Sequence, residues 1–98
     1  MARFLITYHG PGMPHDPESV AKAKAAFGKW LNEAGKAVVD PGAPLNMRRQ
    51  VASGAPTQPA AIDGYSIVEA ESEEQVVKLL QTHPFVGRGG TLQINKCL

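Results

Sequence analysis

The 98-residue sequence predicts an α+β domain, because short β-branched and aromatic stretches alternate with two stretches whose apolar residues recur at helical spacing. The elements occur in the order strand, helix, strand, strand, helix, strand. With right-handed crossovers, two such strand–helix–strand halves form one antiparallel sheet in the order 4-1-3-2, with both helices on the same face. The sequence therefore predicts a single ferredoxin-like βαββαβ domain over residues 1–98.

In the first half, residues 4–8 are apolar or β-branched and predict a central strand, which glycine and proline end after His9. Asp16 and Pro17 then mark a helix start, since Asp caps the first N–H groups and Pro fits the first helical position. Apolar side chains recur every three or four residues up to Ala34, and Gly35 provides the C-terminal stop. Trp30 lies in this stripe and is expected in the core.

A second strand is predicted at residues 37–39 and is expected to end at the Asp-Pro-Gly sequence of residues 40–42. Residues 41–61 are rich in Pro, Gly, Ser, Asn and Gln, which favours an irregular hairpin over a bare loop. Within that hairpin, residues 47–51 could extend the strand.

The second half opens with a strand at residues 65–70, followed by a capping box that begins at Ser72. Pro84 prevents the second helix from continuing much beyond Thr82. Residues 87–90 are expected to form a loop, and residues 91–96 alternate as the last strand.

Composition narrows the classes of partner. Ten basic and nine acidic side chains give a net charge of +1, which provides no field to attract nucleic acid or an anionic membrane. The single cysteine, Cys97, cannot form an internal disulfide, and the apolar run at the N-terminus is too short for a signal peptide or a membrane span. These features predict a cytoplasmic protein without nucleic-acid or membrane partners.

The predicted sheet has one face without helices, and such a face needs a cover. Its residues are expected to be apolar and to come from one alternating set of strand positions or the other: Phe4, Ile6, Ile67, Leu92 and Ile94, or their alternates. A small domain gains stability from a partner subunit. We therefore expect a homodimer that pairs through its sheet faces.

The chain resembles the YCII-related family over almost its whole length. The resemblance is carried, in order, by Tyr8-His9-Gly10, by Trp30 and residues 35–40, by residues 64–72, and by His83-Pro84-Phe85 before Gly89-Gly90. It implies a dimeric α/β barrel in which two four-stranded sheets face each other. Most members of the family have no known function, and some resemble small lyases or isomerases.

In some of these relatives a His on the first helix and an Asp have been suggested as a catalytic pair. The predicted first helix of this chain contains no histidine, and the Asp-Gly-Pro-Phe signature of a related branch is absent. The resemblance therefore implies a counterpart only for the acidic partner, at Asp40.

The topology also predicts where polar side chains gather. His9, Asp40 and Asp63 stand at strand ends that share one edge of the sheet, and the first loop and the end of the second helix reach the same edge. All three histidines are therefore expected there, since His15 lies in that loop and His83 ends that helix. Loops at one end of an α/β sheet are common ligand sites.

His9 and Asp40 are the two catalytic residues predicted at this edge. His9 could exchange protons near neutral pH if Asp40 or Asp63 oriented its ring; the alternative is a histidine that bonds only to loop backbone. Asp40 and Asp63 each precede a turn, where a carboxylate commonly accepts backbone N–H bonds instead. For Asp16, a helix cap is the favoured interpretation.

Four residues are predicted to bind a ligand: His15, Asp63, Tyr65 and His83. Histidines with a carboxylate could instead hold a metal, but their spacing matches no known metal motif, so no metal and no cofactor are predicted. The adjacent Arg48 and Arg49 would point to opposite sides of a strand, toward an anionic substrate, a dimer interface or solvent.

We thus expect a dimeric α/β-barrel protein that binds a small organic molecule in a pocket at the His9 end of the sheet. The alternative is a small cofactor-independent enzyme, lyase-like or isomerase-like, that transfers a proton through His9 with Asp40 or Asp63. Neither the ligand nor the reaction type follows from the sequence.

Overall fold

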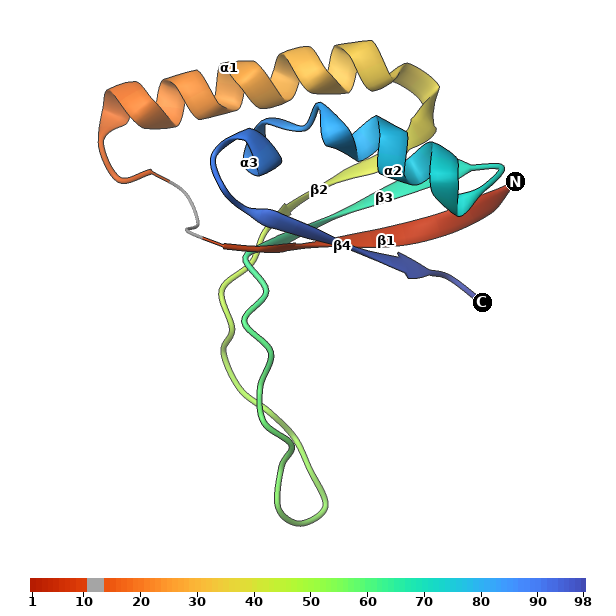
Figure 1. Cartoon of the computed structure of the whole chain (residues 1–98). Helices are drawn as coiled ribbons and strands as arrows, with labels where there is room; N and C mark the ends of the chain where they lie inside the picture. The colour runs from red at the N-terminus through yellow and green to blue at the C-terminus, as the bar shows by residue number, and fades with distance from the viewer. Residues whose placement is uncertain (11–13) are drawn as a thin grey trace.

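The computed structural model describes residues 1–10 and 14–98 and has one layer of helices on one four-stranded antiparallel sheet (Figure 1). The strands lie in the order β2-β3-β1-β4, as predicted, so the ferredoxin-like α+β fold is confirmed. Of the loop predicted before the first helix, residues 11–13 lie outside the described part. The elements are β1 (Ala2–His9), α1 (Pro17–Ala34), the 3-10 turn η1 (Gly35–Ala37), β2 (Val38–Pro44), β3 (Gly64–Ala70), α2 (Glu73–Gln81), α3 (Pro84–Gly87) and β4 (Thr91–Lys96).

β1 lies in the middle of the sheet and pairs with both β3 and β4. Successive side chains of a strand point to opposite faces, so Phe4, Ile6 and Tyr8 all face the helices. Phe4 and Ile6 are buried in the core, whereas Tyr8 lies half-buried at its margin. The core between sheet and helices consists of Phe4, Ile6, Trp30, Val68, Ala70, Val76 and Leu80.

The helix boundaries follow the capping chemistry. Asp16 Oδ2 accepts a hydrogen bond from the Ser19 backbone N–H at 2.9 Å, and this bond lowers the pKa of Asp16. Gly35 ends α1 with a positive φ of 59°. Trp30 is buried as predicted, and its indole N–H donates to the Leu79 carbonyl at 3.2 Å, which joins α1 to α2.

The second strand differs from the prediction. β2 does not end at residues 40–42 but continues through them to Pro44, with shifts of register on both sides of Asp40. Proline is tolerated there because β2 is an edge strand, where one side of the backbone needs no partner. Residues 47–51 do not extend the strand.

A short helix that the sequence did not predict, α3, begins at Pro84. His83 caps it, because its Nδ1 accepts a hydrogen bond from the Phe85 backbone N–H at 3.0 Å. The prediction that α2 ends near Thr82 is confirmed, and α3 takes up part of the expected loop at residues 87–90. This helix places His83 and Phe85 over the end of the sheet.

The face of the sheet away from the helices carries the alternate residues. Phe4, Ile6, Leu92 and Ile94 pack toward the helices, whereas Leu5 and Ile67 pair with each other on the opposite face. Polar residues lie there too: Thr7 pairs with both Tyr65 and Gln93, and Asn95 pairs with Leu5. The expectation of an apolar bare face was therefore only partly right, since Leu5 and Ile67 are apolar but Thr7, Gln93 and Asn95 are polar.

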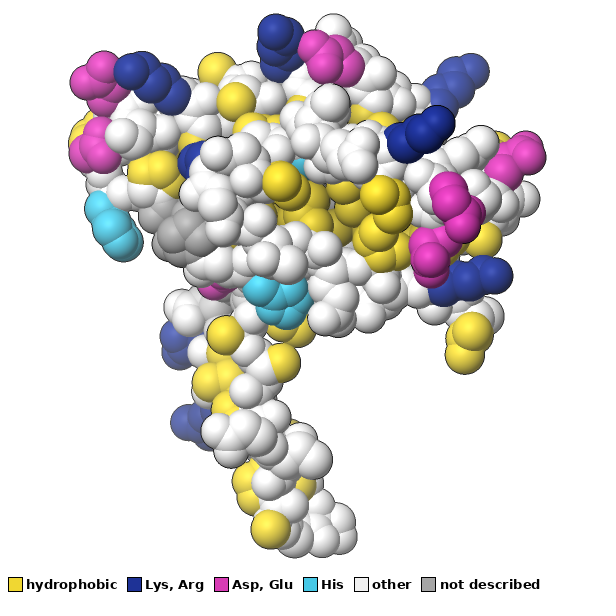
Figure 2. Space-filling view, viewed as in Figure 1, with side chains coloured by type: hydrophobic (Ala, Val, Ile, Leu, Met, Phe, Trp, Pro, Cys, Tyr) yellow, Lys and Arg dark blue, Asp and Glu magenta, His cyan; other side chains and the backbone are white. Residues whose placement is uncertain are grey.

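A long segment, residues 45–62 (called the arm below), projects from the sheet on the side away from the helices (Figure 1). Its base is closed by a hydrogen bond of 2.9 Å from the Leu45 N–H to the Asp63 carbonyl. The arm is exposed almost throughout and carries hydrophobic side chains along its length (Figure 2). Met47 is 64% exposed and Val51 is fully exposed. Among the described residues, no helix is long and apolar enough to cross a bilayer.

Candidate functional site

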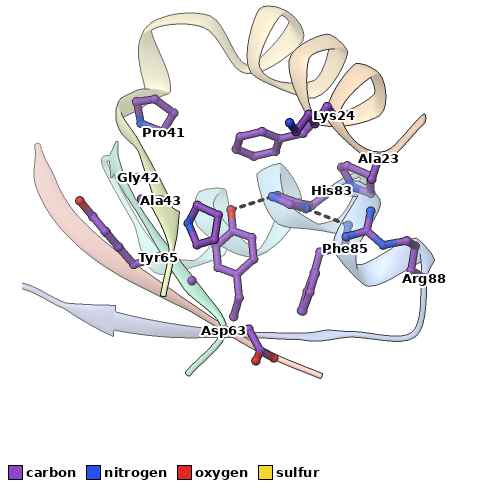
Figure 3. Close-up of a pocket in the computed structure, with 15 residues that line it drawn as sticks. Ala23, Lys24, Pro41, Gly42, Ala43, Asp63, Tyr65, His83, Phe85 and Arg88 are labelled. Atoms are coloured by element: carbon purple, nitrogen blue, oxygen red, sulfur yellow. Dashed lines mark hydrogen bonds between the residues drawn. The ribbon is translucent and has the colours of Figure 1, made fainter. Parts of the chain in front are cut away.

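A cavity of about 270 Å³ lies between α1, α3 and the sheet. Most of its wall is apolar, and the aromatic residues Tyr8, Phe27, Tyr65 and Phe85 contribute to it. A segment of β2 that includes Pro41 and Gly42 forms the opposite wall, and His83 lies beside α1 and α3 (Figure 3). The cavity is therefore at the end of the sheet where the sequence predicted a pocket, but on the face that the helices cover.

A chain of four hydrogen bonds crosses the cavity wall. The Phe85 backbone N–H donates to His83 Nδ1 at 3.0 Å, and His83 Nε2 lies 2.9 Å from the Tyr8 hydroxyl (Figure 3). That hydroxyl lies 2.7 Å from Ser66 Oγ, which in turn donates to the Pro41 carbonyl at 2.8 Å. We call these side chains, His83, Tyr8 and Ser66, the polar chain.

The two ends of the polar chain fix its direction. The Phe85 N–H can only donate, so His83 Nδ1 carries no proton and the neutral ring must carry its proton on Nε2. The Pro41 carbonyl can only accept, so the Ser66 hydroxyl donates to it. Tyr8 therefore accepts from His83 and donates to Ser66, and its oxygen keeps one lone pair.

Burial keeps the polar chain uncharged. Desolvation, together with the positive charge of Arg88, lowers the pKa of His83 from 6.5 to about 4. Burial also raises the pKa of the Tyr8 hydroxyl, and its hydrogen bond to Ser66 opposes this only in part. Near neutral pH the imidazole and the phenol are both neutral, so each acts as a hydrogen-bond partner and neither as a charged group.

The imidazole of His83 is enclosed by aromatic rings. The Trp30, Tyr8 and Phe27 ring centroids lie 4.4, 5.2 and 5.5 Å from it. The side chain is only 3% exposed. This enclosure is the main physical cause of the low pKa, and it holds the ring in one orientation.

The irregular part of β2 places the last acceptor of the polar chain. Gly42 has a φ of 77°, in the left-handed region that glycine tolerates, and its N–H donates to Asp40 Oδ1 at 2.8 Å. The bulge leaves the Pro41 carbonyl free to accept from Ser66 of β3. Bulges that redirect single groups are common beside functional sites.

The predicted pairing of His9 with a carboxylate is not formed. His9 Nδ1 lies 2.9 Å from the Ala61 carbonyl and Nε2 lies 2.8 Å from Thr7 Oγ1, so no carboxylate of the described residues bonds to the ring. The described residues that line the cavity do not include His9 either. Asp40 bonds to the Gly42 N–H within its own turn. The catalytic roles of His9 and Asp40 stay a prediction, without the contact that was expected to support them.

The predicted ligand-binding residues divide into two groups. Asp63, Tyr65 and His83 line the cavity. The Asp63 carboxylate accepts from the Gly10 N–H at 2.9 Å, and the Tyr65 ring points away from His83 (Figure 3). His15 is exposed near the start of α1 and is not among the described lining residues.

The site residues predicted from the sequence do not include Tyr8, Ser66 or Phe85, although Tyr8, as an aromatic, is a candidate to line a ligand cavity. A signal for the first two was present, because each is a polar residue on the strand face that otherwise carries Ile6, Val68 and other core residues. A hydroxyl on such a face needs a partner. Within residues 1–10 and 14–98, no cluster of three His, Cys, Asp or Glu side chains could hold a metal ion.

Comparisons with known proteins show the fold alone. No family model matches the chain, and no curated protein sequence matches it either. Among solved structures, it is similar to 5-chloro-2-hydroxyhydroquinone dehydrochlorinase from Burkholderia phenoliruptrix AC1100, which was solved in complex with 2,5-dihydroxybenzoquinone. The TM-score is 0.55 at 19% identity, over 95% of this chain and 91% of the dehydrochlorinase chain. The chain thus shares the α+β fold of a protein that holds a small ring compound.

Proposed function

We propose that this protein binds a small organic molecule in the cavity between α1, α3 and the sheet, as a relative of the YCII-related proteins. The observation that carries the proposal is the polar chain of fixed direction in the wall of an otherwise apolar cavity. Ligand sites in proteins combine such apolar walls with a few placed polar groups. The free lone pair of the Tyr8 oxygen is available to a ligand that donates a hydrogen bond.

The size of the cavity supports a ligand of about one ring. Its volume of about 270 Å³ is just below the range of roughly 300–1,000 Å³ that is usual for drug-sized ligands. The dehydrochlorinase of the same fold was solved with a single substituted ring. Ring compounds are therefore the first probes to use with this chain.

A second candidate is an enzyme that transfers a proton in the same cavity, lyase-like or isomerase-like, and the activity named for the dehydrochlorinase favours it. His83 and Tyr8 are placed better for this than His9, because they line the cavity. In the neutral polar chain, however, His83 has no free nitrogen to accept a proton and Tyr8 remains protonated. Binding is therefore the preferred proposal.

Filling the cavity tests the proposal. Ala23 is buried in the cavity wall, so Ala23→Leu is expected to occupy the ligand's space and to weaken binding of 2,5-dihydroxybenzoquinone and benzamide by roughly tenfold or more. Binding is measured from amide chemical shifts in NMR titrations. The matched control is Ala25→Leu, the same change at an exposed position of α1. If neither compound shifts the amides of Gly42, Gly64 and Phe85, or if both variants bind equally well, the proposal fails.

We also propose that two copies pair through the bare sheet face, with a cytoplasmic location as expected from the sequence. Leu5 and Ile67 supply an apolar centre on that face, and the arm projects on the same side with Met47 and Val51 exposed. A second copy would cover both surfaces together.

Ile67→Asp is expected to convert the dimer into a monomer, since it would bury an unpaired carboxylate at the centre of the interface. Sedimentation velocity measures the change in mass. Val77→Asp introduces the same charge on α2, on the opposite side of the molecule, and should leave the dimer intact. A wild-type chain that sediments as a monomer at about 100 μM would contradict the pairing.

A further inference from the structure

Two basic side chains line the cavity, and neither forms an ion pair with an acidic side chain of residues 1–10 or 14–98. Lys24 comes from α1 and Arg88 directly follows α3, and Figure 3 places both around the end of the cavity where His83 lies. The ion pair found among the described residues joins Lys22 to Glu18 and involves neither of them. A basic pair beside an apolar cavity favours an anion there.

Arg88 is an exposed residue, but its side chain makes a contact at the cavity. Its guanidinium lies over the Phe85 ring, 5.5 Å from the centroid, in a cation–π contact. Phe85 is itself buried and is fixed by the short helix α3. The planar guanidinium is thus positioned beside an aromatic wall, which suits the recognition of a planar carboxylate.

The other ionisable groups of the cavity do not cancel this charge. Asp63 is the one acidic residue among the described lining residues, and its carboxylate is already engaged by the Gly10 N–H. His83 is neutral near pH 7, because burial and the nearby Arg88 hold its pKa at about 4. Two positive charges therefore act on the cavity against one negative charge that has its own partner.

We propose that the ligand is a small planar organic monoanion, whose ring lies against the aromatic wall formed by Phe27 and Phe85 and whose carboxylate or phenolate pairs with Lys24 and Arg88. This inference rests on the proposed binding function of the cavity and adds the chemical class of the ligand. A nucleotide or other large polyanion does not fit, because about 270 Å³ holds roughly one substituted ring.

The test compares three probes: benzoate, its neutral analogue benzamide, and inorganic phosphate. NMR titrations at about pH 7 are expected to show that benzoate binds roughly tenfold more tightly than benzamide, with amide shifts centred on Phe85 and Arg88. Lys24→Gln and Arg88→Gln should each remove most of that advantage, because each should weaken benzoate binding much more than benzamide binding. Lys22→Gln, on the same helix but paired with Glu18, should change neither affinity.

The outcomes separate this inference from the function on which it rests. If benzamide binds as tightly as benzoate, or if Lys22→Gln weakens benzoate as much as Lys24→Gln does, the cavity binds a ring compound but the anionic class is wrong. If phosphate binds as tightly as benzoate, the ring is not recognised and the class is again wrong. If no probe binds at about 10 mM, the binding function and the class both fall.

Discussion

Lowering the pH from 7 to 4 is expected to reduce the free energy of unfolding by up to ~3 kcal/mol through His83 alone. In the folded protein the pKa of His83 is held at about 4 by burial and by Arg88, whereas in the unfolded chain it returns to about 6.5. Between these values the unfolded chain binds more protons, so stability is full above pH 6.5 and is lost as the pH falls toward 4. Urea denaturation at a series of pH values measures this loss.

The control for this prediction is the variant His83→Asn. Asparagine can still cap α3 in the way that His83 does, but it does not titrate. The fall in stability between pH 6.5 and 4 should therefore flatten in His83→Asn and persist in His15→Asn, where the changed residue is exposed. Equal pH profiles for His83→Asn and the wild type would contradict the buried neutral imidazole. Trp30, the single tryptophan, lies 4.4 Å from His83 and provides a fluorescence signal for the same titration.

Much of the fold could be predicted because its signals are local. Asp16 and Ser72 both cap helices as expected, and the order of the strands follows from connection rules that hold for most folds of this type. The second strand was placed less well because its signal is not local. Pro41 and Gly42 are typical of a turn, and only the edge position of β2 and the pairing with β3 allow the strand to continue.

The location of the candidate site was predicted, but only part of its composition was. The topology correctly suggested that Asp63 and His83 approach one end of the sheet, and both line the cavity. Which histidine points inward depends on strand phase: His9 follows Thr7 on the bare face, whereas Tyr8 faces the helices. Lys24 and Arg88 line the same cavity only after α1 and α3 are packed, so their spacing in the sequence carried no signal.

The cavity and the bulge of β2 are parts of one arrangement. The bulge leaves the Pro41 carbonyl free to accept a hydrogen bond from Ser66, which fixes the direction of the Ser66 hydroxyl. Ser66 then accepts from Tyr8, which fixes the position of the Tyr8 hydroxyl proton. A change in the backbone of β2 should therefore reach the cavity through hydrogen bonds, even where it removes no side chain that a ligand would touch.

Gly42→Ala is accordingly expected to lower the free energy of unfolding by about 3 kcal/mol or more. A Cβ at this position would lie 1.7 Å from the Tyr65 carbonyl oxygen, and the φ of 77° is unfavourable for alanine. The obstacle is backbone of the neighbouring strand, which cannot turn aside as a flexible side chain can. β2 must move away from β3 instead, and the bond from Ser66 to the Pro41 carbonyl should be lost. Urea denaturation measures the stability, and the amide shifts of residues 64–66 report the movement of the strand.

Gly28→Ala provides a control of opposite sign. Gly28 lies within α1 with no atom near the place of an added Cβ, so alanine there should stabilise the protein by ~1 kcal/mol through its higher helix propensity. If Gly42→Ala unfolded at the same urea concentration as the wild type, β2 would have to be free to shift, and the cavity could not depend on its bulge. A loss of stability in Gly42→Ala but not in Gly28→Ala would instead show that the close approach of β2 and β3 holds the polar chain in place. The two variants can be compared directly because both substitutions add the same methyl group.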